Sequence, residues 1–228
     1  MARTDTLTNF LTDVAAAIKD KKGDDTAILA ANFDTEIANL PLGVGAGAKV
    51  LKSMIERTAT SVEIPNAVTA IGDYAFCGYK SLESITIPDS ITSIGNMAFQ
   101  ECSGLTSITI PDSVASIGIG AFHNCTGLTS IDIPNGVTSI GSNTFYMCSS
   151  LASIVMPSSV EYIGDSAFYD CRSLLEVDFS AHTSVPSIEY QTFWGIPNAC
   201  TIKVPSALLD EWKAATYWNE LDCNFVGV

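Results

Sequence analysis

Apolar and polar residues alternate in a short phrase that returns along most of the chain. Between 107 and 110, Ser107 and Thr109 alternate with Ile108 and Ile110, which is the pattern of a strand with one buried face. We therefore expect the two isoleucines to point inward and the two hydroxyl residues to point outward. Equivalent phrases predict seven strands, near residues 61–64, 84–87, 107–110, 130–133, 153–156, 176–179 and 201–204.

A constant step of 23 residues separates equivalent positions of this phrase. The step holds for three residue types, at Pro65, Pro88, Pro111, Pro134 and Pro157, at Phe76, Phe99, Phe122, Phe145 and Phe168, and at Cys102, Cys125, Cys148 and Cys171. A fixed period of this length indicates a solenoid, in which each coil buries its apolar residues only against neighbouring coils. We therefore expect phenylalanine to stack on phenylalanine from coil to coil. A two-residue insertion in "SAHTSVPSI" shifts the last repeat.

The repeat unit, with Ile-Pro, Ile-Gly, Ala-Phe and Cys at fixed offsets, resembles the BspA-like leucine-rich repeats, also called the treponemal type. The resemblance covers about residues 59–205. It implies an α/β repeat solenoid, a right-handed superhelix with a parallel concave sheet of about seven strands. It also implies a role in adhesion or protein recognition. The family has no shared catalytic residues that could be matched to this sequence. Tyr79 and Ile196 depart from the pattern at the cysteine position, and the sixth repeat lacks the proline.

The segments that flank the repeats carry helical patterns. Residues 1–42 contain two amphipathic stripes, and residues 43–58 form a Gly-rich linker and lead-in. The N-terminal segment weakly resembles structural proteins of phages and repeat proteins of gut bacteria. These helices either cap the first repeat or attach to a partner or to a second copy, and the sequence leaves both interpretations open. Residues 206–228 predict a C-terminal capping helix, with Ser206 as its N-cap and Trp212 on its apolar face.

The charge of the chain limits the classes of partner. Its 25 acidic and 11 basic residues give a formal net charge of -14, which repels phosphate backbones and anionic lipid. We therefore expect no nucleic-acid partner, and no apolar run approaches the ~18 residues of a membrane span. Asp5 and Asp13 interrupt the N-terminal region, so we read no signal peptide there. The location stays unknown, with a surface, extracellular or virion-associated protein suspected.

Catalytic and metal-binding patterns are weak. We expect the four repeating cysteines to be buried thiols, and we expect no metal site and no cofactor. A disulfide between Cys200 and Cys223 stays open if the protein is exported. The chain has two histidines, His123 and His182, and neither belongs to a catalytic motif. His182, inside the insertion, is the single candidate for a hydrolase site, and we expect the protein not to be an enzyme.

The outward strand positions form the candidate ligand surface. They are rich in hydroxyl and acidic residues, at Ser84, Thr86, Ser107, Thr109, Ser130, Asp132, Ser153, Glu176 and Asp178. The surface lacks the Trp, Tyr and Arg anchors of tight interfaces, so we expect weak or multivalent binding of a protein or glycan. The same hydroxyl residues also suit a solvated strand face with no ligand. The alternative function is a structural spacer or an accessory component of a phage tail or surface assembly, docked through the N-terminal helices.

Overall fold

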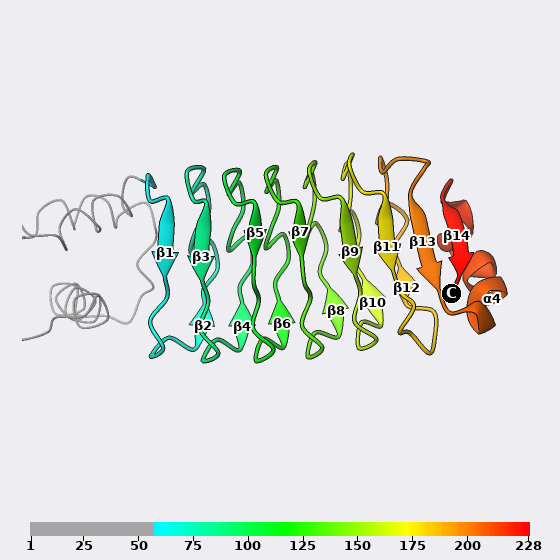
Figure 1. Ribbon diagram of the computed structural model, residues 1–228, viewed down its shortest axis with the longest axis horizontal. Helices are drawn as coiled ribbons and strands as arrows, with labels where there is room; N and C mark the ends of the chain where they lie inside the picture. The colour runs from blue at the N-terminus through cyan, green and yellow to red at the C-terminus, as the bar shows by residue number, and fades with distance from the viewer. Residues whose placement is uncertain (1–56) are drawn as a thin grey trace, which may run out of the picture. The chain divides into compact units, whose positions relative to one another are not determined.

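The computed structural model describes residues 57–228, of which Thr60–Val228 form one compact unit. The expectations for residues 1–42, and for nearly all of 43–58, lie outside the described residues. Within the compact unit the chain winds through successive coils that lie side by side (Figure 1). Each repeat coil carries one strand of a first row and, on its return path, one short strand of a second row.

The first row confirms the seven predicted strands to within two residues. It comprises β1 Ser61–Glu63, β3 Ser84–Thr86, β5 Ser107–Ile108, β7 Ser130–Ile131, β9 Ser153–Val155, β11 Glu176–Asp178 and β13 Thr201–Val204. All paired strands of this row are parallel, since every coil brings the chain back to the same side. Equivalent repeat positions lie opposite each other, as Ser107 does with Ser130. Ile108 and Ile110 are buried and Ser107 and Thr109 are exposed, as the alternation predicted.

The second row is a feature that the sequence pattern did not predict. It comprises β2 Ala70–Ile71, β4 Ser93–Ile94, β6 Ser116–Ile117, β8 Ser139–Ile140, β10 Tyr162–Ile163 and β12 Ser187–Ile188. Its strands pair in the orders β2-β4-β6 and β8-β10-β12, again in parallel. In each strand the isoleucine is buried. Two residues are too short a segment to show alternation, which is why the row escaped prediction.

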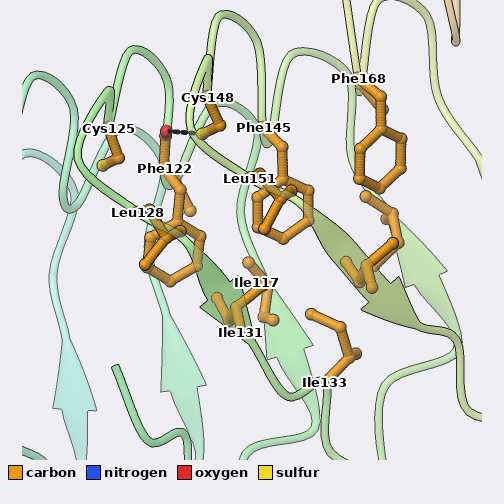
Figure 2. Packing of buried hydrophobic residues seen from close by; sticks show 14 of the residues in the cluster. Ile117, Phe122, Cys125, Leu128, Ile131, Ile133, Phe145, Cys148, Leu151 and Phe168 are labelled. Carbon is orange, nitrogen blue, oxygen red and sulfur yellow. Dashed lines mark hydrogen bonds between the residues drawn. The ribbon is translucent and has the colours of Figure 1, made fainter. Parts of the chain in front are cut away.

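A column of phenylalanine rings runs through the interior of the stacked coils (Figure 2). Rings of successive coils lie 5.1 to 5.6 Å apart between centroids and stack with nearly parallel planes, from Phe76 to Phe193. The inner rings, such as Phe122, have no exposed surface. This confirms the predicted stacking, and it shows that the core is shared by all coils because no coil could bury its ring alone.

A column of cysteines ties each coil to the one before it. Each thiol donates to the backbone carbonyl of the phenylalanine in the preceding coil, at 3.0 to 3.1 Å. Figure 2 shows this bond between Cys148 and Phe122. All four column cysteines are buried and reduced, as predicted, and burial raises the pKa of the Cys102 thiol to about 12. Each of these carbonyls also accepts a backbone N–H within its own coil, as Phe122 does from Cys125. Cysteine suits the position because it is small and its thiol adds a second donor to that carbonyl.

The C-terminal segment closes the stack with both helix and strand. It contains two 3₁₀ turns, η1 Ser206–Leu208 and η2 Trp218–Glu220, the helix α4 Leu209–Ala214 and the strand β14 Asn224–Gly227. The prediction of Ser206 as an N-cap is wrong. Pro205 is the N-cap residue of η1, no side-chain cap bond is present, and the Ser206 N–H donates to the Val228 carbonyl. Strand β14 pairs in parallel with β13, so the cap extends the first row by one strand.

Two tryptophans cover the last coil. Trp212 and Trp218 are buried, and both rings contact Phe179. The Trp218 indole N–H also donates to the Pro186 carbonyl at 2.8 Å. The predicted apolar face of the cap is therefore present. No helix within residues 57–228 has the length and apolar character needed to cross a bilayer.

Candidate ligand-binding surface

The outward side chains of the first row form a continuous surface, which we call the strand face. The strand register places them in two columns that cross the coils, as Ser107 opposite Ser130 and Asp178 opposite Val155 illustrate. Seven of the nine predicted ligand-contacting residues are exposed there, namely Ser84, Thr86, Ser107, Thr109, Ser130, Asp132 and Ser153. Glu176 and Asp178 are half-buried. The structure thus brings the predicted residues onto one surface.

Hydroxyl groups on the strand face differ from those in the turns. Ser90, Ser113 and Ser159 lie in turns, and each donates to a carbonyl of the preceding coil at 2.6 to 2.7 Å. In residues 57–228, the hydroxyls of Ser107 and Ser130 make no hydrogen bond to another protein group. The turn hydroxyls therefore hold the coils together, whereas the strand-face hydroxyls are available to solvent or to a ligand.

The acidic end of the strand face is already occupied by internal contacts. Lys203 Nζ lies 2.8 Å from Glu176 Oε2. The Ser180 N–H donates to Asp178 Oδ1 at 2.8 Å. The hydrogen bond to Glu176 raises the pKa of the Lys203 ammonium. Val155, 59% exposed, lies between Asp132 and Asp178 and separates this end from the hydroxyl-rich coils. The hydroxyl-rich part around β3, β5 and β7 is consequently the more accessible half.

A second aromatic ladder lies at the position after the buried phenylalanines. His123 stacks on Tyr146 at 4.8 Å, and Tyr146 stacks on Tyr169 at 4.9 Å, with nearly parallel planes. The three rings are half-buried, and burial lowers the pKa of His123. Because Tyr146 is covered on both faces by its neighbours, this ladder helps to hold the coils together. The sequence could have indicated this ladder, because His123, Tyr146 and Tyr169 each directly follow the repeat phenylalanine.

His182 has a structural environment. It is 4% exposed, its Nε2 lies 3.2 Å from the Val160 carbonyl, and its ring meets the edge of Phe179 at 5.1 Å. Burial lowers its pKa, which favours the neutral imidazole. These contacts place the insertion beneath the cap, next to Trp212. The position that we considered for a hydrolase is thus part of the packing between the last coils and the cap.

Acidic, histidine and cysteine side chains do not gather into metal-binding groups of three or more anywhere in residues 57–228. Cys200 and Cys223 are neighbours across β13 and β14, where the Asn224 N–H donates to the Cys200 carbonyl at 2.9 Å. Both thiols are reduced. The Cys200 thiol hydrogen-bonds to Cys223, which raises the pKa of Cys200 and lowers that of Cys223. Because the two thiols are neighbours, a Cys200–Cys223 disulfide in an oxidising compartment stays a prediction.

Comparisons with known proteins agree with this architecture. The model of the BspA-type leucine-rich repeat region matches residues 55–175 and 138–219, in six copies. A crystal structure of a leucine-rich repeat protein of T. pallidum is 37% identical, with a TM-score of 0.52, over 53% of this chain and 56% of that one. A leucine-rich repeat protein from Eubacterium ventriosum is 28% identical, with a TM-score of 0.53, over 61% of this chain and 43% of that one. A comparison with curated proteins gives no match.

The chain therefore covers about half of the length of these two solved structures. The repeat match, in contrast, extends over most of the described residues and includes the coils that carry the strand face. The family model and the register of the coils rest on the same 23-residue unit, and together they assign this protein to the BspA-type leucine-rich repeat family.

Proposed function

We propose that this protein is a non-enzymatic recognition module that binds a partner protein through the hydroxyl-rich part of the strand face. Leucine-rich repeat proteins of this kind are protein-interaction or adhesion modules. The observation that carries the proposal is the row of exposed serines at one repeat position, Ser84, Ser107, Ser130 and Ser153, in four successive coils. Such a row offers identical donors and acceptors at the ~4.8 Å spacing of paired strands.

Protein is the ligand class that this surface supports best. The strand face has no exposed tryptophan or tyrosine in its two columns within the described repeats, so it lacks rings on which a sugar would stack. Its hydroxyls, together with Glu63 and Asp132, suit an extended and basic protein segment. The net charge of -14 favours the approach of such a partner at low salt. Because anchors are few, we expect affinity to come from several coils at once.

A paired set of charge-adding variants tests this proposal. The double change Ser107→Arg and Ser130→Arg modifies the strand face, and Ser116→Arg with Ser139→Arg places the same charges on exposed serines of the second row. The proteins are applied to arrays of purified extracellular-matrix proteins and of glycans. We expect wild type and the second-row variant to bind the same protein spots and the strand-face variant to lose them.

Each other outcome contradicts the proposal in a distinct way. If the strand-face variant binds as strongly as wild type does, the strand face is not the binding surface. Binding confined to glycan spots would replace the protein ligand with a saccharide. If no spot binds and removal of residues 1–45 releases the protein from a native assembly, the spacer or phage-tail role is the better explanation.

A further inference from the structure

A pocket of about 420 Å³ lies between the last repeat coil and the cap, away from the strand face. Aromatic side chains contribute much of its wall, from Tyr190 and Trp194 of the last coil and from Tyr217 of the cap. Phe193, the last ring of the phenylalanine column, also lines it. Two acidic residues, Glu220 and Asp222, also line the pocket.

The end of the repeat explains why these rings are accessible. In the inner coils, each return path is covered by the following coil, as Tyr146 is by Tyr169. The last coil has no successor, and the cap covers Phe193 with Trp218 at 5.5 Å. Tyr190 and Trp194 remain 55% and 53% exposed. Large exposed rings next to a hollow are unusual for a solenoid end that serves only as a lid.

The ring planes meet at angles and form a corner. Tyr190 lies 6.3 Å from Trp194 at 49° and 6.0 Å from Tyr217 at 67°, measured between centroids and planes. Tyr217 has a φ of 64°, a left-handed conformation that bulky residues rarely adopt. In the repeats, positive φ values recur at equivalent positions, for example at Met97 and Asn143, whereas Tyr217 has no repeat counterpart. The cap therefore holds this ring in place at a cost in backbone strain.

The charge of the pocket has one sign. Glu220 and Asp222 are both exposed, and the lining includes no lysine or arginine. Asn198 donates to Asp222 Oδ2 at 2.6 Å and fixes that carboxylate at the rim. Because the whole chain carries a net charge of -14, the surroundings do not cancel this local charge. The pocket thus combines aromatic faces, whose quadrupole is negative, with two carboxylates.

We propose that this pocket binds an alkylated ammonium group. Aromatic faces combined with negative charge attract a weakly hydrated organic cation, and a corner of angled rings surrounds a compact round group. A sugar would need one flat, open ring face, and an anion would be repelled by Glu220 and Asp222. The site uses no residue of the strand face, so it is independent of the function proposed above.

Titration with choline and with its neutral carbon isostere, 3,3-dimethylbutan-1-ol, tests the role of charge. The two molecules have the same shape, and the full-length protein is followed by NMR shifts of the tyrosine ring protons. We expect choline to bind at least about tenfold more tightly than the isostere, because the isostere loses the attraction of the rings and carboxylates. Equal affinity for both would reduce the site to an apolar hollow and overturn the proposal. Absence of choline binding would overturn it directly.

Variants then locate the binding. Tyr190→Ala and Glu220→Gln should each weaken choline binding several-fold, while Tyr74→Ala should leave it unchanged. Tyr74 is the matched control because it is also 55% exposed and lies in the first coil. Thermal melts of all three variants check that the fold is kept. If Tyr190→Ala binds choline as wild type does, or if methyl glucoside competes for the pocket as well as choline does, the assignment is wrong.

Discussion

The inner coils and the C-terminal end cover their apolar rings in different ways. Within the inner coils, Phe122 packs between two phenylalanine rings. Cys125 donates to the Phe99 carbonyl, and every other column cysteine donates to the equivalent carbonyl of its own preceding coil. At the C-terminal end the step of 23 residues is broken, and Trp212, Trp218 and β14 replace the missing coil. Repetition therefore gives a uniform interior and a uniform surface, whereas its interruption produces a pocket lined by aromatic side chains.

The largest expected effect is the loss of an inner ring. Phe122→Ala removes stacking on both sides and leaves a cavity in a fully buried site, so we expect it to cost about 3–5 kcal/mol of unfolding free energy. Urea denaturation of the full chain measures this cost. Phe76→Ala is the comparison, since Phe76 stacks on only one phenylalanine and is not completely buried. A cost at Phe122 no larger than that at Phe76 would contradict a core shared between coils.

A smaller effect is expected where the cap meets the last coil. Trp218→Phe keeps an aromatic ring but leaves the buried Pro186 carbonyl without its donor, which should cost about 1–3 kcal/mol. The matched control is Trp194→Phe, because Trp194 is exposed and no equivalent bond is lost. Thermal unfolding should separate the two variants clearly. Equal melting temperatures would mean that the cap does not hold the last coil through this bond.

A smaller effect again is expected in the cysteine column. Cys125→Ala removes the bond to the Phe99 carbonyl and a small volume, and about 1–2 kcal/mol should be lost. The same change at Cys148 should cost the same amount within experimental error, because its bond to Phe122 has nearly the same length. The comparison is made by urea denaturation under reducing conditions. Two very different costs would show that the coils are not energetically equivalent.

The fold of the inner coils was predictable because the same signal occurs many times. Alternation at Ser107–Ile110 and the constant step of Phe and Cys gave the first row, the stacking and the buried thiols. The second row was missed because two residues carry no periodicity. The hydrogen bonds from the cysteine thiols to the backbone carbonyls were not predicted. A sequence shows the size and polarity of a side chain, but it does not show which group a buried thiol faces.

The candidate sites differ in the same way. The strand face followed from alternation alone, so its residues could be named in advance, although the contacts of Glu176 and Asp178 could not. The pocket depends on four aromatic residues from two segments, and its shape arises from the path of the cap. The sequence predicted a helix there, with Ser206 as its cap, and gave no indication of β14. Tertiary pairing with β13 decided the conformation of these residues.

The smallest effect expected is a dependence of stability on pH. Burial lowers the pKa of His182 in the folded protein, so the unfolded chain binds a proton more readily. Stability should therefore be constant above the usual histidine pKa of about 6.5 and fall as the pH decreases below it. Urea denaturation between pH 8 and pH 5 measures this slope. In His182→Gln the dependence of the unfolding free energy on pH should be shallower. An unchanged dependence would mean that other titrating groups cause it.

The reactivity of the cysteines tests the shared, closed interior most directly. Burial raises the pKa of the column thiols, to about 12 at Cys102 and Cys171, while the bond from Cys200 lowers that of the half-buried Cys223. Native protein is treated with iodoacetamide at pH 8, and each labelled peptide is quantified by mass spectrometry over increasing urea. We predict that Cys223 reacts in native buffer and that the column cysteines react together, only as the whole unit unfolds. Labelling of the column cysteines in native buffer as fast as Cys223 would contradict a core closed by stacked coils.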